Sequence, residues 1–234
     1  MAEAEKRSPA YVRLDTVRGV FRFSGRQLLI TLIVLFVVFP FVEPYAWGNA
    51  AVSLLFTLVM LSALLAVGGG KHRVLITGLV LLVPALVLRW LPHLGLMDGG
   101  QPVSLASYGL FVGYVTFQLV LYVLRAARVD AEVLSAGVSI YLLIGWLWAL
   151  LYSFCNLVVP ESFHFLNTET HSSPLYEMFY FSFGTLTTAG YGDIVPVSGP
   201  ARMLSSMESV LGVLYLAVLV SRLVSAYGSR PPAK

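Results

Sequence analysis

Charged residues are scarce in this chain, and their scarcity excludes most soluble folds. Of 234 residues, only 12% are charged and 58% are hydrophobic, with a mean hydropathy of +0.82. A soluble domain carries about twice that charged fraction, so the composition is typical of a membrane protein. The formal net charge is only +3. The basic residues are explained by membrane topology, and nucleic acid is not expected as a partner.

Cysteine is nearly absent as well. Cys155 is the single cysteine and lies in an apolar stretch, which excludes an intrachain disulfide and a cysteine-based metal site within one chain. No pair of metal-ligating histidines and no nucleophile elbow is present. The glycines before Lys71 lack the second half of a phosphate-binding loop. The chain is therefore not expected to be an enzyme or to need a cofactor.

Six apolar segments approach or exceed the roughly 20 residues that cross a bilayer. They cover residues 27–42, 46–67, 74–91, 103–124, 133–159 and 203–227. Residues 173–187 are too few to cross and predict a re-entrant helix between the fifth and sixth spans. The sequence thus predicts an all-α membrane fold with six transmembrane helices and one re-entrant pore helix.

The basic residues predict the orientation of these spans. Of 15 lysines and arginines, all but Arg89 and Arg202 fall on one side of the predicted topology. The others are Lys6, Arg7, Arg13, Arg18, Arg22, Arg26, Lys71, Arg73, Arg125, Arg128, Arg222, Arg230 and Lys234. The positive-inside rule then places both termini in the cytoplasm of a cell-membrane protein. We expect no cleaved signal peptide in the first 26 residues.

The run from Thr187 to Asp193, TTAGYGD, is the strongest motif in the chain. Two glycines around a tyrosine allow an extended strand whose successive carbonyls turn toward a common axis, and four such strands make rings of oxygen that replace the water around a cation. The run resembles the selectivity filter of tetrameric potassium channels, whose usual pattern is T-x-G-Y-G-D. The resemblance covers residues 131–230.

The re-entrant helix is expected to aim at this run. Ser173 is a good N-cap and Pro174 fits the first helical position. A helix of roughly 20 Å from there reaches about halfway into the bilayer. Its C-terminal carbonyls then point at the membrane centre, where four negative dipole ends stabilise a cation.

The resemblance implies a role for each filter residue. Potassium ions are expected at the carbonyls of Thr188, Ala189, Gly190 and Tyr191, with the Thr188 hydroxyl closing the innermost ring and Gly192 completing the filter. Ala189 replaces the more usual valine or isoleucine, which leaves a weakly selective monovalent cation channel as an alternative. Gly184 stands where some members carry a glutamate, so that carboxylate contact is not expected.

Filter support is expected from residues around the strand, namely Thr187, Asp193, Tyr180, Phe181 and Glu208. Glu208 is the one acid deep within the last span, where an ionisable residue is costly. We therefore expect it to brace the pore helix near Thr185 or Ser182.

Gating candidates lie on the last span. Gly212 follows Tyr191 at the distance where the family carries a hinge glycine, and either a bend or close helix packing explains a glycine there. Apolar residues after it recur at helical spacing and either line a constriction that closes by dewetting or pack against helices and lipid. They are Val213, Leu216, Val220 and Val224.

The sequence divides into three parts. Residues 1–26 are a basic cytoplasmic segment, either a flexible tail or an interfacial helix on anionic inner-leaflet lipids. Residues 27–130 form an accessory four-helix bundle, and 131–234 form the pore domain. The fourth span holds none of the arginines that a voltage sensor needs, so steep voltage gating is not expected. We also expect no sensory module after the last span.

The expected protein is a homotetramer that conducts potassium passively, because each chain supplies one filter strand and the resemblance implies four. A potassium-uptake transporter subunit is the other alternative. Such subunits usually carry several pore repeats with degenerate filters, and this chain has one intact filter.

Overall fold

The computed structural model describes residues 9–42, 45, 47–68, 72–96, 101–126, 130–166 and 173–228, with side chains described only between residues 25 and 222. Seven α-helices, one 3₁₀ helix and two short strands follow one another along these residues. They are α1 (Pro9–Val42), α2 (Gly48–Gly68), α3 (His72–Trp90), η1 (Leu91–Leu94), α4 (Gln101–Arg125), α5 (Ala131–Val158), β1 (Phe163–Phe165), α6 (Pro174–Leu186), β2 (Ile194–Pro196) and α7 (Gly199–Gly228).

Six of these helices are long and apolar enough to cross a membrane, which confirms the predicted all-α fold with six spans. The helix α6 has 13 residues and is too short to cross. The first helix is longer than the predicted span, because it begins at Pro9 and runs to Val42 without a break at residue 26. Proline is accepted at the start of a helix, and the next proline is Pro40. Residues 9–26 therefore belong to the same helix as the first span, which covers Gly25–Val42.

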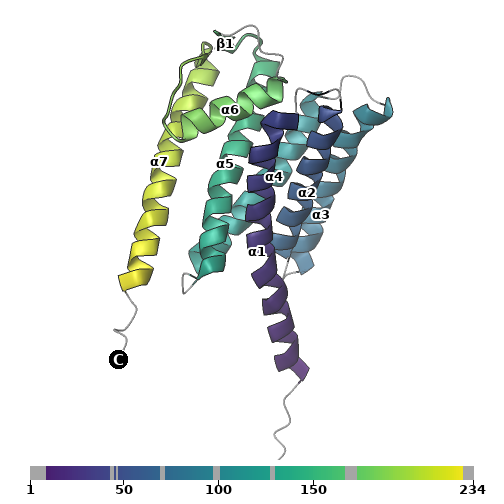
Figure 1. Cartoon of the computed structure of the whole chain (residues 1–234), viewed down its shortest axis with the longest axis vertical. Helices are drawn as coiled ribbons and strands as arrows, with labels where there is room; N and C mark the ends of the chain where they lie inside the picture. Colours follow the sequence, from purple (N-terminus) through teal and green to yellow (C-terminus); the bar gives the residue numbers. More distant parts are fainter. Residues whose placement is uncertain are drawn as a thin grey trace, which may run out of the picture.

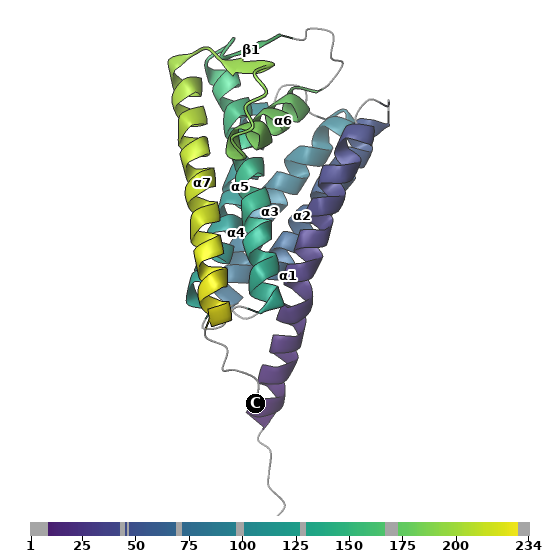
Figure 2. The same cartoon turned by 60° about the vertical axis from the view of Figure 1, so that its left-hand side comes forward.

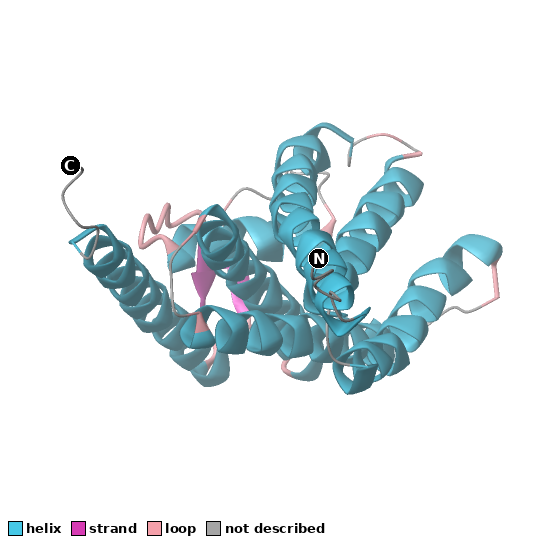
Figure 3. Ribbon diagram, turned by 90° about the horizontal axis from the view of Figure 1, so that it is seen from below, coloured by secondary structure: helices cyan, strands magenta, loops and turns pink. Residues whose placement is uncertain are grey.

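The helices stand side by side, and α6 slopes between α5 and α7 near one end of the molecule (Figure 1). The N-terminal end of α1 and the C-terminal end of α7 both lie at the opposite end (Figure 2). Seen from below, the helix that leads to the C-terminus, α7, stands at the edge of the molecule, away from the N-terminal end of α1 (Figure 3). The strand β1, which precedes α6, lies at the same end of the molecule as α6 (Figure 1). The strand β2, which follows α6, pairs with β1 and therefore lies there too.

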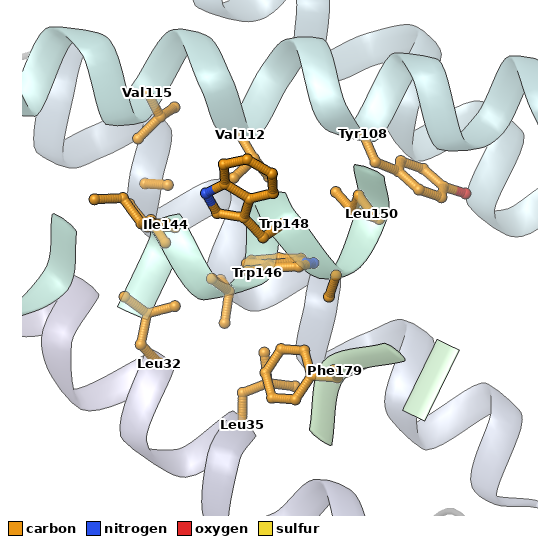
Figure 4. Packing of buried hydrophobic residues seen from close by; sticks show 14 of the residues in the cluster. Leu32, Leu35, Tyr108, Val112, Val115, Ile144, Trp146, Trp148, Leu150 and Phe179 are labelled. Atoms are coloured by element: carbon orange, nitrogen blue, oxygen red, sulfur yellow. The ribbon is translucent and has the colours of Figure 1, made fainter. Parts of the chain in front are cut away.

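The apolar core joins the first four helices to α5 and α6. Trp146 of α5 lies 4.8 Å from Phe56 of α2 between ring centroids, and Phe39 of α1 lies 5.7 Å from Phe179 of α6. Figure 4 shows Trp146 and Trp148 between Val112 of α4 and residues of α1 and α6. Because aromatic pairs contribute beyond the area they bury, α6 is held directly by α1 of its own chain.

Two charged contacts tie the helices together at the other end. Asp130 caps α5 by accepting hydrogen bonds from the backbone N–H groups of Glu132 and Val133, at 3.1 and 3.0 Å. Glu132 is buried and its carboxylate lies 3.3 Å from Nε of Arg26. A buried carboxylate needs such a partner, so this ion pair fixes α1 against the start of α5.

The second contact joins α7 to the end of α4. The Arg222 guanidinium donates hydrogen bonds to the carbonyls of Val123, Leu124 and Ala126, the last two at 3.3 and 3.0 Å. These carbonyls belong to the C-terminal end of α4, where the helix dipole is negative and favours a cation. The contact fixes the last turns of α7 to the accessory helices.

Candidate functional site

The short helix α6 is set in place by its sequence at both ends. Ser173 caps it by accepting a hydrogen bond from the backbone N–H of Tyr176 at 3.4 Å, and Pro174 occupies the first turn. Phe183, near its C-terminal end, lies over Gly145 of α5, where a methyl group would stand 2.4 Å from the ring. This close approach lets α6 enter between α5 and α7, with its carbonyl end directed inward.

The chain reverses direction immediately after α6. Thr187 ends the helix, and the backbone N–H of Thr188 bonds to the carbonyl of Thr185 at 3.0 Å. The N–H of Gly190 bonds to the carbonyl of Gly184 at 3.1 Å. These bonds hold the first half of the predicted filter against the last turn of α6.

Three residues of the predicted filter have left-handed backbone angles. The φ values are +61° at Thr188, +57° at Gly190 and +82° at Gly192. Glycine adopts such angles without steric cost, whereas a residue with a Cβ resists them. Non-glycine residues at positive φ are uncommon outside functional sites. Every second residue from Thr188 to Gly192 thus has a positive φ, and the carbonyls do not alternate in direction as they do in a regular β-strand.

Tyr180 of α6 supports the strand from behind. Its ring stacks on Tyr191 with centroids 5.5 Å apart and planes 11° apart. Its hydroxyl donates a hydrogen bond to Oδ2 of Asp193 at 2.8 Å. One side chain therefore contacts the two residues on either side of Gly192.

Phe181, the other expected neighbour of the filter, contacts α5 and β1 within the single chain. Its ring contacts Tyr152 of α5 at 5.1 Å and Phe163 of β1 at 5.3 Å between centroids. It therefore fixes α6 to α5 and to β1. Thr187 donates its hydroxyl to the carbonyl of Phe183 at 2.7 Å, which closes the end of the helix.

The strands β1 and β2 close the loop that carries the predicted filter. They pair antiparallel, with Phe163 opposite Pro196 and Phe165 opposite Ile194. The N–H of Leu166 bonds to the carbonyl of Asp193 at 2.9 Å. The pairing holds the segment after the filter to the segment before α6, and the sequence analysis did not predict it.

Glu208 of α7 is fully buried and binds two hydroxyl groups. Tyr152 of α5 donates to its Oε2 at 2.5 Å, and the Ser182 hydroxyl of α6 lies 2.5 Å from its Oε1. The Ser182 hydroxyl also donates to the carbonyl of Gly145 at 2.7 Å. Since a hydroxyl has one proton, Ser182 shares it between the Glu208 carboxyl and the Gly145 carbonyl. Glu208 therefore joins α5, α6 and α7 through its two hydroxyl partners.

Gly212 of α7 faces the end of α6. A methyl group at this position would lie 2.3 Å from the carbonyl oxygen of Leu186. Such a distance is far inside van der Waals contact, and the obstructing atom belongs to the backbone. Of the two interpretations of this glycine, the structure supports close packing, and α7 is one helix on both sides of it.

Replacing Gly212 with alanine is expected to lower the stability of the protein by about 1–3 kcal/mol, because the added methyl group overpacks the contact with Leu186. The measurement is the denaturation midpoint of the purified protein in detergent. Gly109→Ala is the matched control, since a methyl group there meets no atom within 4 Å. Equal midpoints for the two variants would contradict the packing role.

The remaining gating candidates lie on exposed faces of α7. Val213, Leu216 and Val220 are 54%, 41% and 55% exposed in the single chain. The backbone of Val224 is helical, but its side chain lies outside the described part of the chain. The single chain thus brings together Tyr180, Tyr191, Asp193 and α6, with Gly212 against the end of α6, and it leaves Val213, Leu216 and Val220 exposed.

The chain matches known proteins over this region. A family model described as "Ion channel" matches residues 109–228. Protein LctB of Geobacillus stearothermophilus is 31% identical over 125 residues, which are 49% of this chain and 92% of that protein. No solved structure matches the chain significantly.

Two further relatives are much longer. The voltage-gated potassium channel Kch of Escherichia coli (strain K12) is 32% identical over 118 residues, which are 50% of this chain and 26% of Kch. The inward rectifier potassium channel Kirbac3.1 of Paramagnetospirillum magnetotacticum is 33% identical over 95 residues, 41% of this chain and 29% of that protein. The chain therefore spans less than a third of the length of these two relatives.

Proposed function

Because the chain belongs to the ion channel family, whose model matches 109–228 of its 234 residues, we propose that it is a potassium-selective channel that conducts passively. The observation that carries the proposal is the strand after α6. Its glycines have φ values of +57° and +82°, and Tyr180 holds Tyr191 and Asp193 from behind. Relatives named as potassium channels support the choice of ion.

In this proposal the filter oxygens replace the hydration shell of the ion. The carbonyls of Thr188, Ala189, Gly190 and Tyr191 form successive rings, and the Thr188 hydroxyl forms the innermost one. The C-terminal end of α6 adds a negative dipole end below them. Potassium is the permeant ion and no further cofactor is proposed.

We propose that the channel is a homotetramer, since one chain has one filter strand and a closed ring needs several. The exposed surface of α7 supports the assembly of several chains. Only 11% of the residues in the most apolar stretch of α7 are buried, against 67% for α5. Tyr191 is 69% exposed although it belongs to the filter. Neighbouring copies and the pore would account for these faces.

The accessory helices are proposed to hold the pore without sensing voltage steeply. Within α4 the one basic residue is Arg125, at its last position. A steep response needs several charges that cross the membrane field. The contact between Arg222 and the end of α4 supports a mechanical link from the accessory helices to α7.

The protein is a multi-pass membrane protein, and we propose the cell membrane with both termini in the cytoplasm. The N-terminal end of α1 and the C-terminal end of α7 share one end of the molecule (Figure 1). Among the described residues, Arg26 contacts the start of α5 and Arg222 contacts the end of α4 at that end, which supports a positive-inside topology. Residues before 27 are proposed to contact anionic lipid headgroups there.

Ion flux in liposomes tests the proposal. Purified protein reconstituted with potassium inside is expected to release potassium at a rate well above protein-free vesicles, and to release sodium much more slowly. Equal release of both ions would contradict potassium selectivity and favour the alternative, a weakly selective cation channel. Release of neither ion would contradict conduction.

A further inference from the structure

A cavity of about 570 Å³ lies between the accessory helices and the start of α6. It lies toward the end of the molecule that carries the filter loop, and its lining comes from α2, α3, η1, α4, α5, β1 and α6. Its polar lining includes Arg89, His93, Ser104, Tyr108, Asn156 and Ser173. The conducting strand is not part of the lining, so the cavity is separate from the proposed pore.

Arg89 is the charged group of this cavity. Its Nε atom is buried and has no hydrogen-bond partner among the described residues. The guanidinium carbon lies 5.0 Å from the centre of the Phe56 ring, and the side chain interacts with Tyr108. Neither group neutralises the cation, and no carboxylate of the described residues forms an ion pair with it. A largely desolvated cation without a counter-charge is costly.

The lining favours an anion in a second way. The first residues of α6, Pro174 and Leu175, border the same cavity next to the cap residue Ser173. The N-terminal end of a helix carries a partial positive charge and favours negative groups. Among the described lining residues there is no aspartate or glutamate. Figure 4 shows Tyr108 at the edge of the apolar core, with its hydroxyl directed away from Trp146 and Trp148.

The geometry points to a binding site for a phosphate-type oxyanion, held by the Arg89 guanidinium and the N-terminal end of α6. Arginine presents a planar fork of donors that matches the oxygens of phosphate. Apolar residues complete the lining, including Leu88, Leu105, Leu157 and Met178. The anion therefore comes either from a phospholipid headgroup whose chains follow these apolar residues or from free phosphate.

Occupation of this site links the accessory helices to the pore helix, because Arg89 belongs to α3 and Ser173 precedes α6. The inference concerns binding alone and does not depend on the ion that the pore conducts. Its test therefore needs no flux measurement.

Native mass spectrometry of the protein released from detergent tests whether the site binds a phospholipid headgroup. Wild type is expected to retain phosphatidylglycerol in preference to phosphatidylcholine, since the latter headgroup carries a compensating positive charge. Arg89→Gln is expected to reduce this retention at least about tenfold, because a hydrogen bond to a charged group is lost. Arg202→Gln is the matched control, as Arg202 is an exposed arginine that does not line the cavity.

A second arm tests free phosphate with the same proteins. Inorganic phosphate raises the denaturation midpoint of wild type and of Arg202→Gln, but not of Arg89→Gln, if the site takes the free anion. Leu157→Trp fills the cavity without removing the charge, because Leu157 is 39% exposed and lines it. This variant keeps the test valid if Arg89→Gln does not fold. If Leu157→Trp weakens the binding of phosphatidylglycerol or of phosphate, the result supports the site.

Two results would overturn the inference. One is wild type that neither prefers phosphatidylglycerol nor responds to phosphate. The other is retention and midpoint shifts in Arg89→Gln and Leu157→Trp that equal those of wild type.

Discussion

Replacing Tyr191 with alanine is expected to abolish the potassium current or its preference for potassium over sodium. The substitution removes the ring that stacks on Tyr180, 5.5 Å away, and leaves the strand between Gly190 and Gly192 without a side chain behind it. The carbonyls that replace the ion's water must keep their positions. Single-channel recording in planar bilayers measures both current and selectivity.

Two controls test whether the effect on selectivity comes from the Tyr191 ring, from its hydroxyl, or from the loss of any exposed tyrosine. Tyr191→Phe keeps the stacking and is expected to conduct like wild type. Tyr45→Ala removes another exposed tyrosine, which stacks on Trp47 at 5.4 Å away from the filter. It should leave selectivity unchanged. Wild-type selectivity in Tyr191→Ala would show that this strand is not the filter.

Replacing Glu208 with alanine is expected to destabilise the protein by about 3–5 kcal/mol. The change opens a cavity in a fully buried position and leaves the hydroxyls of Tyr152 and Ser182 without their shared partner. Because these residues come from α5 and α6, the position of the pore helix should loosen with the loss of stability. Titration of the purified protein with sodium dodecyl sulfate measures the free energy of unfolding.

Glu208→Gln is the informative comparison. An amide keeps the size of the carboxyl, and it has one oxygen that accepts from Tyr152 and one nitrogen that donates to the Ser182 oxygen. We therefore expect Glu208→Gln to lose less than half of the stability that Glu208→Ala loses. Equal losses for the two variants would contradict the stabilising role of these hydrogen bonds.

The spans and the channel family were predictable because each depends on a local signal. Length and hydropathy identify a membrane helix without knowledge of its contacts, and all six predicted spans are confirmed. The motif from Thr187 to Asp193 pointed to channels, and the match over 109–228 confirms that family. The roles of single filter residues remain predictions.

Contacts between distant residues were harder to predict. Tyr152 and Glu208 are 56 residues apart, and the sequence indicated only that an acid within a span needs a partner. The strands β1 and β2 have three residues each, too few for an alternating pattern to identify them. Arg89 did give a signal, because it broke the positive-inside pattern.

Tyr180 and Phe181 have different neighbours for a simple geometric reason. Successive residues on an α-helix point about 100° apart, so within one chain Tyr180 contacts Tyr191 while Phe181 contacts Tyr152. The start of α1 was missed for another reason. Its first residues are basic, and hydropathy identifies only the part of a helix that lies in the bilayer core.

The reversal potential with equal potassium on one side of a bilayer and sodium on the other tests potassium selectivity most directly. A tenfold or greater preference for potassium displaces this potential by at least about 59 mV, in the direction that potassium flows down its gradient. The account predicts a displacement of that size or larger for the wild-type protein. A reversal potential at zero would contradict it.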